Sequence, residues 1–180
     1  MNNIGITGHT KGIGLELNNT LKESGHIIYG YSRSNDYDLS HSITIDRIVF
    51  SVNENQIDTF VINAEYDHSQ LKLLYALDRL WEKDRDKTIV VISSISGTYP
   101  NRFVPHEYSI QKLALDKAVE QLQINRPYRL INIRPGYVDT AATNHVTSPK
   151  MSVSDVANVI TWSLTAPLHI LVRNITFTPR

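Results

Sequence analysis

A group of glycines near the start of the chain has the spacing of a phosphate-binding loop. Residues 3–26 read NIGITGHTKGIGLELNNTLKESGH, and four of the chain's eight glycines fall within positions 5–14. An apolar, strand-like run precedes them and an amphipathic, helix-like run follows. The first turn of such a helix presents unpaired N–H groups and a positive dipole end to a pyrophosphate, and glycine lets the phosphate approach the backbone closely. The spacing therefore predicts a dinucleotide site, with a glycine-rich turn of no function as the alternative.

Strand-like and helix-like segments alternate along the whole chain. Short apolar runs predict strands at 3–7, 26–31, 58–63, 87–93, 128–133 and 170–177. Apolar residues at three- or four-residue spacing predict helices at about 12–24, 41–53, 68–83, 107–125 and 153–165. Strands that are apolar on both faces and separated by helices imply a mostly parallel sheet between two helix layers. We therefore expect one α/β domain over residues 1–180, with a doubly wound sheet of six to seven strands, and a surface loop at the polar stretch 139–152.

One connection is too short for this plan. Only five residues lead from Arg33 to Asp38, whereas a parallel crossover with its helix normally takes about 10–12 residues or more. Either the third strand of the sheet is vestigial, or the helix that connects to it has been deleted.

The composition excludes several functional classes. The 180 residues carry 18 Lys and Arg against 18 Asp and Glu, and the basic residues are scattered, so a surface for nucleic acid is not indicated. Cysteine is absent, and the seven histidines do not fall at the spacing of metal ligands, so we expect no metal site. No apolar run is long enough to span a bilayer, and the chain does not begin with a signal-peptide pattern. These features predict a cytoplasmic protein that acts without a membrane.

The glycine motif resembles the fingerprint TGxxxGIG of the short-chain dehydrogenase/reductase family, and further motifs follow in the family's order. They are Asp38-Leu39 before a helix, Asn63-Ala64-Glu65 where the family has NAG, Ser94 in VVISSISG, Tyr108 and Lys112 in a YxxxK pattern, and Pro135-Gly136 with Thr140 in IRPGYVDT. The resemblance covers nearly the whole chain. It implies a three-layer Rossmann fold in which the region of the third strand and the substrate loop are trimmed.

The resemblance assigns Ser94, Tyr108 and Lys112 as the catalytic residues. In the family the tyrosine exchanges a proton with the substrate oxygen, the serine holds that oxygen, and the lysine binds the nicotinamide ribose. The chemistry of the residues agrees, because Tyr108 and Lys112 share one helix face, and a nearby ammonium lowers the pKa of a phenol from its usual value of about 10. The resemblance therefore implies an oxidoreductase that interconverts a small-molecule alcohol and a carbonyl by hydride transfer with a nicotinamide cofactor.

The residues after the second predicted strand favour NADP(H) over NAD. An NAD site places a carboxylate about 20 residues beyond the glycines, but this region holds Arg33, whose guanidinium suits the 2′-phosphate of NADP, with Ser32 or Ser34 as further donors. Lys11 adds a second positive charge, whereas Asp36 offers the alternative of a displaced NAD carboxylate. With the family positions, the residues expected to bind the cofactor are Gly8, Thr10, Lys11, Gly12, Ile13, Gly14, Ser32, Arg33, Asp38, Leu39, Asn63, Ala64, Tyr108, Lys112, Pro135, Gly136, Val138 and Thr140.

Several features depart from the family's pattern. The family's fourth catalytic residue, an asparagine that helps to hold a relay water, is missing, and Tyr66, Asp67 and His68 occupy its neighbourhood. Either Asp67 or His68 holds the water, or the relay is lost. Glu65 replaces the glycine of the NAG motif. The stretch 140–152 leaves little room for a lid, so we expect an open pocket for a large, flat or polymeric substrate, or one completed by a partner subunit.

Two other functions remain open. A dinucleotide-binding sensor or scaffold would explain the missing asparagine and the glutamate, but it would have no need of the three catalytic residues. An epimerase or dehydratase of the related extended family would need a larger C-terminal domain.

The resemblance also implies a homodimer or homotetramer. The family associates through its fourth and fifth helices, here at about 68–83 and 107–125. Their leucines either form such a seam or face the sheet, and they are Leu71, Leu74, Leu113 and Leu115.

Overall fold

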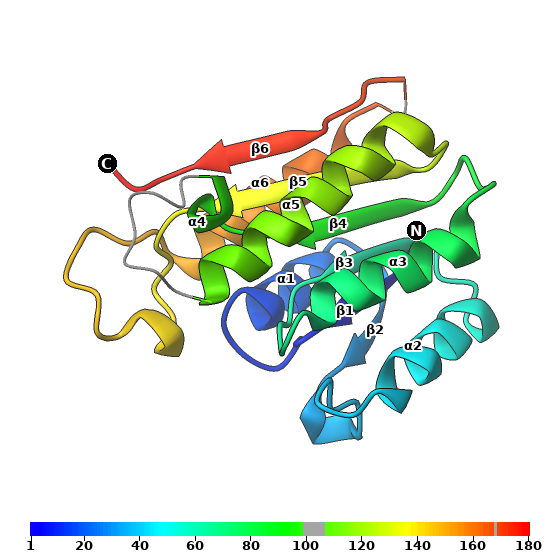
Figure 1. Ribbon diagram of the computed structural model, residues 1–180, viewed down its shortest axis with the longest axis horizontal. Coiled ribbons are helices and arrows are strands. Elements are labelled where there is room, and N and C mark those ends of the chain that lie inside the picture. Colours follow the sequence, from blue (N-terminus) through cyan, green and yellow to red (C-terminus); the bar gives the residue numbers. More distant parts are fainter. Residues whose placement is uncertain (99–106, 168) are drawn as a thin grey trace.

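The computed structural model of the protein describes residues 1–98, 107–167 and 169–180. In these residues six strands form one sheet in the order β2-β1-β3-β4-β5-β6, and every neighbouring pair is parallel (Figure 1). The strands are β1 (Asn3–Thr7), β2 (Ile27–Tyr31), β3 (Thr59–Ile62), β4 (Thr88–Ile92), β5 (Arg129–Pro135) and β6 (Asn174–Phe177).

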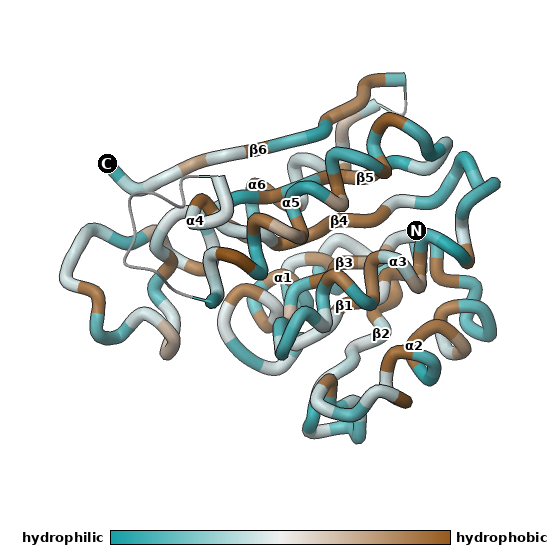
Figure 2. The backbone as a smooth tube through the Cα atoms, viewed as in Figure 1, coloured by the Kyte–Doolittle hydropathy of each residue, from teal (hydrophilic) through white to brown (hydrophobic). Residues whose placement is uncertain are grey.

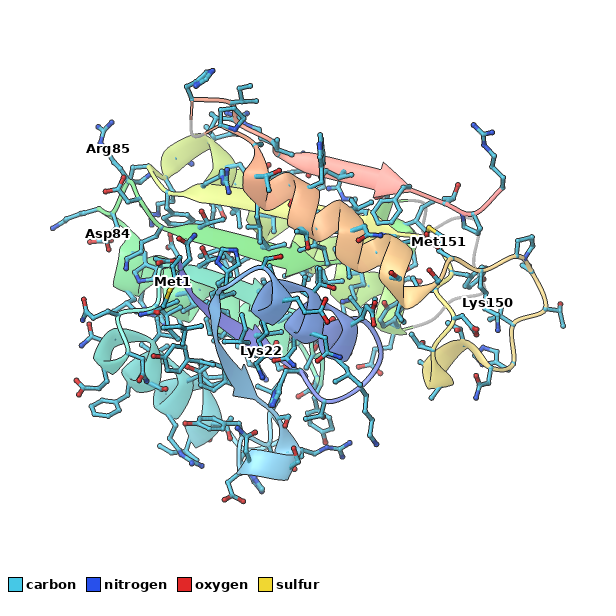
Figure 3. All side chains as sticks on the ribbon, turned by 180° about the vertical axis from the view of Figure 1, so that it is seen from behind. Met1, Lys22, Asp84, Arg85, Lys150 and Met151 are labelled. Atoms are coloured by element: carbon cyan, nitrogen blue, oxygen red, sulfur yellow. The ribbon has the colours of Figure 1, made fainter. Side chains whose placement is uncertain are left out.

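Helices cover both faces of this sheet. They are α1 (Gly12–Glu23), α2 (Ile43–Glu54), α3 (Ser69–Trp81), the short α4 (Ile95–Thr98), α5 (Glu107–Asn125) and α6 (Val153–Thr165). The helices α2, α3 and α5 pack on one face, whereas α1 and α6 lie side by side on the other, which Figure 3 shows from behind. Among the described residues, no helix has the length and apolar character needed to cross a membrane. The three-layer, doubly wound arrangement expected from the sequence is confirmed.

The central strands supply the core because both of their faces are apolar. Every residue of β3 and β4 is buried. Along β3 the side chains alternate, so that Phe60 joins the cluster under α2, α3 and α5, and Val61 joins the cluster under α1 and α6. Figure 2 shows the resulting concentration of apolar residues along the middle of the sheet. A sheet buried on both faces is the usual scaffold for a ligand site at its carboxyl edge.

The largest departure from a full family sheet lies after β2. The chain leaves Tyr31, forms a single 3₁₀ turn at Arg33–Asn35 and enters α2, and this fully described stretch contains no strand. The third strand is therefore missing altogether, and one helix connects β2 to β3. As a consequence β2 forms an edge of the sheet, and the turn after it can face a ligand at the carboxyl end of β1.

Other boundaries predicted from the sequence are mostly confirmed. The strand expected at 170–177 begins only at Asn174, and the short helix α4 was not predicted. The loop at 139–152 contains a 3₁₀ turn at Ala141–Thr143, and a bridge between Val138 and Met151 joins its two ends.

Two of the four leucines considered for a dimer seam face the sheet instead. Leu74 and Leu115 are buried in the cluster under α2, α3 and α5, whereas Leu71 and Leu113 are only partly buried. The prediction that Leu74 or Leu115 contributes to a dimer seam is therefore wrong, because both side chains are already buried in the core of the domain.

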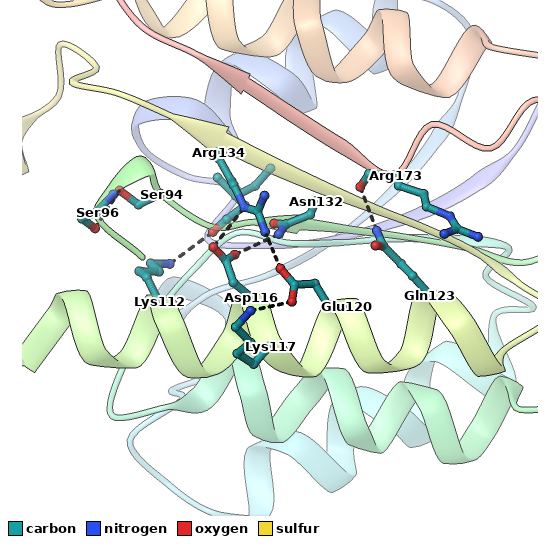
Figure 4. A network of polar contacts seen from close by, with 11 residues as sticks. Ser94, Ser96, Lys112, Asp116, Lys117, Glu120, Gln123, Asn132, Arg134 and Arg173 are labelled. Carbon is teal, nitrogen blue, oxygen red and sulfur yellow. Dashed lines mark hydrogen bonds and ion pairs between the residues drawn. The ribbon is translucent and has the colours of Figure 1, made fainter. Parts of the chain in front are cut away.

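A buried ion pair anchors α5 to β5. The carboxylate of Asp116 accepts hydrogen bonds from Nδ2 of Asn132 and from Nε of Arg134, each at 2.9 Å (Figure 4). A second carboxylate, that of Glu120, lies 3.5 Å from the same guanidinium and is more exposed. These contacts hold the helix that carries Tyr108 against the strand that ends at the Pro-Gly motif.

We expect the substitution D116A to lower the free energy of unfolding by about 3–5 kcal/mol, because it leaves a buried guanidinium without its main acceptor. The control E120A removes a more exposed partner of the same Arg134 and should cost about 1 kcal/mol or less. Urea unfolding followed by circular dichroism measures both values. Equal losses in the two variants would contradict the prediction.

Candidate active site

The loop between β1 and α1 has the geometry that phosphate binding requires. Gly8 and Gly12 have φ angles of 71° and 52°, which other residues adopt only with strain. A β-carbon on Gly14 would lie 2.2 Å from the carbonyl oxygen of Gly8, so the helix starts in direct contact with the loop. Ile13 packs into the core under α1 and α6. Within the described structure, the N-cap residue Lys11 provides no side-chain cap, so the first-turn N–H groups keep their capacity to bind an anion.

Hydrogen bonds tie the ends of β1 and β3 together beside this loop. The hydroxyl of Thr7 accepts hydrogen bonds from the backbone N–H groups of Asn63 and Ala64 at 2.9 and 3.0 Å. In return, the side-chain Nδ2 of Asn63 donates to the main-chain carbonyl of Thr7 at 3.0 Å. The side chain of Asn63, which was expected at the cofactor, thus fixes the two strand ends that carry the loop.

A cavity of about 680 Å³ opens at the carboxyl ends of β1, β2 and β3. The residues that line it are Gly8, Thr10, Lys11, Tyr31, Ser32, Arg33, Ser34, Tyr37, Asp38, Leu39, Ser40, Ala64, Glu65 and Tyr66. Eight of the residues expected to bind a cofactor meet in this lining. Parallel α/β sheets bind their ligands at this end of the strands, so we name this space the dinucleotide cavity, after the ligand predicted from the sequence.

Two exposed cations face the dinucleotide cavity. Arg33 and Lys11 both line it, and the hydroxyls of Ser32 and Ser34 lie 2.8 Å apart in the same wall. A guanidinium with neighbouring hydroxyl donors is a suitable partner for a phosphate group.

The two aspartates near this wall differ in their position and contacts. The backbone N–H of Ser40 donates to Asp38 at 3.0 Å, and the hydrogen bonds from Ser40 hold the pKa of Asp38 below its usual value. Among the described residues, the lining includes Asp38 but not Asp36. The main-chain carbonyl of Asp36 accepts a hydrogen bond from Arg47 at 2.8 Å. The alternative in which Asp36 stands in for an NAD carboxylate therefore has no support from its position.

Ser94, Tyr108 and Lys112 are brought together from two segments. The hydroxyl of Ser94, just after β4, accepts hydrogen bonds from the N–H and the hydroxyl of Ser96 at 3.2 and 2.9 Å, and it is hydrogen-bonded to Tyr108. On α5, Nζ of Lys112 lies 5.3 Å from the centre of the Tyr108 ring. A β-carbon on Gly97 would lie 2.7 Å from the Lys112 backbone, so α4 packs tightly on α5 and brings the serine to the tyrosine.

Burial is the main influence on both ionisable groups. It raises the pKa of Tyr108, although 39% of the whole residue is exposed; the hydrogen bond from Ser94 opposes this shift, and the Glu65 carboxylate adds to it. Lys112 is only 3% exposed, and burial lowers its pKa to about 8 against the opposing charges of Glu65 and Asp116. The pKa of Tyr108 is therefore raised and not lowered as expected, because desolvation of the phenolate is the largest influence on it.

One residue at this site was missed by the sequence analysis. Gln70, in the first turn of α3, accepts a hydrogen bond from Nζ of Lys112 through its Oε1 atom. The residues considered for this place lie elsewhere: the Asp67 carboxylate is 3.6 Å from Lys72 at the surface, and His68 is the N-cap residue of α3. No local pattern marks Gln70, because a glutamine in the first turn of a helix is more often solvated than buried.

A second cavity, of about 700 Å³, adjoins the serine and the tyrosine. In the described part of the chain its lining is mainly apolar, and the lining residues there are Ser94, Ile95, Ser96, Tyr108, Gly136, Tyr137, Ala142, Thr143, His145, Val146, Ser148, Pro149, Thr178 and Pro179. The short loop that follows β5 forms one wall. We name this space the apolar cavity.

The segment after β5 runs from the apolar cavity to the glycine loop. Gly136 lines the apolar cavity, while Pro135 and Val138 are buried. Thr140 lies against the glycine loop, since a β-carbon on Gly12 would be 3.4 Å from its methyl group. The segment that begins with the Pro-Gly motif therefore reaches the glycine motif, although the two are far apart in sequence.

Comparisons with known proteins agree with this architecture. The sequence matches no protein-family model and no curated protein. The structure is similar to a short-chain dehydrogenase/reductase from Vibrio parahaemolyticus, with a TM-score of 0.82, 21% identity, and coverage of 98% of this chain and 99% of the other. It is also similar to a 3-alpha-hydroxysteroid dehydrogenase from Pseudomonas sp. B-0831 complexed with NADH, with a TM-score of 0.80, 19% identity, and coverage of 98% and 95%.

A third similar structure is an alcohol dehydrogenase from the archaeon Thermococcus sibiricus complexed with 5-hydroxy-NADP. Its TM-score is 0.77, the identity is 18%, and 98% of this chain and 96% of the other are covered. The chain therefore has the fold of the short-chain dehydrogenases/reductases.

Proposed function

We propose that this chain is a short-chain dehydrogenase/reductase that uses NADP(H) to interconvert an alcohol and a carbonyl. The observation that carries the proposal is the position of Ser94 and Tyr108, hydrogen-bonded to each other at the wall of the apolar cavity, with Lys112 beside the tyrosine ring. A serine, a phenol and a buried ammonium in this arrangement can hold a substrate oxygen and exchange a proton with it.

The dinucleotide cavity fits the cofactor. Its glycine loop excludes β-carbons where a pyrophosphate would approach the start of α1, and Arg33 and Lys11 supply positive charge. Of the similar proteins described above, one is complexed with NADH and another with 5-hydroxy-NADP, so the preference for NADP(H) rests on this chain's own Arg33. When bound, the cofactor supplies or accepts the hydride.

The chain's own residues handle the proton. In carbonyl reduction, Tyr108 donates its phenolic proton to the substrate oxygen; in alcohol oxidation, the phenolate takes that proton back. The oxygen of Ser94 accepts from Ser96, so its own proton, which is directed to Tyr108 in this structure, can be donated to a substrate oxygen instead. The Lys112 ammonium stabilises the phenolate that remains after proton donation.

The lining of the apolar cavity favours a mainly apolar substrate. Side chains such as Ile95, Tyr137 and Val146 would cover the hydrocarbon part, and the polar pair of Ser94 and Tyr108 would bind the single oxygen that reacts. The volume of about 700 Å³ is large enough for a multi-ring or long-chain ketone.

Carbonyl reduction should decline as the pH rises through about 8. Reduction needs a protonated Tyr108 and a charged Lys112; burial raises the pKa of the first and lowers that of the second to about 8, so the lysine loses its charge first. The pH profile of kcat/KM measures this. A reduction rate that increases steadily across the same range would contradict the assignment.

The decisive test of the function is turnover. Purified protein is mixed with NADPH and a panel of apolar ketones and aldehydes, and the loss of NADPH absorbance is followed. Turnover by the wild-type protein and not by Y108F supports the proposal. Tight NADPH binding without turnover of any carbonyl by the wild-type protein would instead support a dinucleotide-binding sensor.

The sensor function has one observation in its favour, the carboxylate of Glu65. It lines the dinucleotide cavity and is close enough to influence the pKa values of both Tyr108 and Lys112. The negative charge of Glu65 disfavours the phenolate form of Tyr108, which hinders proton transfer but would not matter to a sensor without turnover.

We expect E65Q to bind NADPH about 3- to 10-fold more tightly, because it removes a negative charge from the wall of a partly hydrated cavity that would hold an anion. The control D67N removes an exposed carboxylate two residues away that pairs with Lys72, and it should change little. Fluorescence titration with NADPH measures both. Weaker binding by E65Q would show that Glu65 accepts a hydrogen bond from the cofactor.

The assembly and the location of the protein stay predictions. A homodimer or homotetramer through α3 and α5 can still use the partly buried Leu71 and Leu113, and a cytoplasmic location follows from the sequence features alone.

A further inference from the structure

Gln70 is buried where three elements meet. It has no exposed surface, and its amide nitrogen donates to the main-chain carbonyls of Ile62 and Ile92, both at 3.0 Å, and of Asn63 at 3.3 Å. These carbonyls lie at the ends of β3 and β4, and Gln70 belongs to the first turn of α3. The side chain thus bridges two central strands just before the segment that carries Ser94.

These bonds fix the direction of the amide. The NH₂ group of a glutamine donates, whereas its oxygen only accepts. Reversing the amide of Gln70 would place Oε1 against three carbonyl oxygens, so Oε1 has to point the other way. There it accepts the hydrogen bond from Nζ of Lys112.

The ammonium of Lys112 depends on neutral oxygens in this position. Besides Gln70 it donates to the carbonyl of Ile92 at 3.2 Å, and Glu65 and Asp116 act on it through their charge. A buried ammonium without acceptors would lose its proton or move towards water. Two fixed acceptors instead keep it charged and beside the ring of Tyr108.

We infer that Gln70 is a positioning residue that holds the Lys112 ammonium at the catalytic tyrosine. Its effect on the reaction rests on the proposed function, whereas its effect on the charge of Lys112 does not. A glutamine that only joined β3 to β4 would need its NH₂ group alone. The hydrogen bonds of the NH₂ group to β3 and β4 also direct the oxygen to Lys112, so the position of the ammonium depends on the position of the two strands.

Gln123 provides a matched control. Its amide nitrogen also donates to two main-chain carbonyls, those of Leu130 at 3.0 Å and of Arg173 at 2.8 Å (Figure 4). It lies three turns further along α5 than Lys112. The substitution Q123M therefore removes the same kind of structural bonds without touching the active site.

The test is the titration of Lys112 in the cofactor-free protein, followed by NMR of ¹³C-labelled lysine side chains. Q70M keeps the length of the side chain but removes the acceptor, so the pKa of Lys112 should fall by about 1–2 units, the usual worth of a hydrogen bond to a charged group. Q70E adds a carboxylate and should raise it, and Q123M should leave it unchanged. In the unmodified protein, the side-chain amide signal of Gln70 should shift with the same midpoint as Lys112, which keeps the test valid if Q70M does not fold.

An unchanged Lys112 titration in Q70M, an equal shift in Q123M, or a Gln70 amide signal that does not follow Lys112 would overturn the inference. In turnover, Q70M should have a pH profile displaced to lower pH, and above the wild-type midpoint its kcat should be about tenfold lower than that of the wild-type protein for each unit by which the pKa of Lys112 falls. A wild-type kcat and pH profile in Q70M would also overturn the role. Absence of turnover in the wild-type protein defeats the proposed function, and the NMR titration then still decides whether Gln70 controls the charge of Lys112.

Discussion

Y108F should lower the rate of carbonyl reduction by about 10²- to 10⁴-fold and leave NADPH binding almost unchanged. The phenol is the group that donates the proton, and the loss of a positioned general acid costs a factor of this size. The ring itself stays in place, because its packing and its contact with Lys112 need no hydroxyl. Steady-state kinetics and a fluorescence titration with NADPH separate the two effects.

Tyr137 offers the control for this experiment. It lines the same apolar cavity and has the same exposed fraction of 39%, but it is not placed beside the lysine. Y137F should therefore keep kcat within a few-fold of the wild-type value. If Y108F retains most of its activity, or if both variants lose activity equally, Tyr108 is not the proton donor.

R33A should weaken NADPH binding by about 10- to 100-fold and change NADH binding little. The expected loss is that of a hydrogen bond between a guanidinium and a charged phosphate, reduced by exposure to water. Because NADH has no 2′-phosphate, the ratio of the two dissociation constants isolates this contact from general effects on the cavity. The loss for NADPH should shrink at high salt, since Arg33 is exposed.

Arg47 is the matched control for the charge of Arg33. Its guanidinium lies 4.8 Å from the centre of the Tyr37 ring, next to the dinucleotide cavity, and donates to the carbonyl of Asp36. R47A removes one positive charge nearby without removing a lining residue. A similar loss of NADPH affinity in both variants would mean that a general positive field, rather than Arg33, selects the cofactor. A tenfold or larger preference of the wild-type protein for NADH would overturn the assignment altogether.

The sequence by itself determined most of the framework. The apolar runs of β3 and β4 are buried on both faces, so composition alone marks them as central strands. The glycine spacing identified the loop between β1 and α1, because the constraints that require glycine there are local ones: a positive φ at Gly8 and the contact of Gly14 with the backbone of Gly8. The spacing of Tyr108 and Lys112 is also a local property of the sequence, because residues four positions apart lie on the same face of a helix.

The tertiary structure decided what these residues can do. The contact between Gln70 and Lys112 spans 42 positions, and no periodicity encodes which long side chain reaches which buried ammonium. The pKa of Tyr108 rises rather than falls, because burial depends on how α4 packs against α5 and not on the neighbouring lysine alone. For the short connection after β2 the sequence left two explanations open, and the structure decided between them, because the turn at Arg33–Asn35 leads into α2 with no strand before it. A residue required by the local backbone conformation can be recognised from the neighbouring sequence. The charge and the hydrogen-bond partners of a buried group cannot, because they depend on every element packed around it.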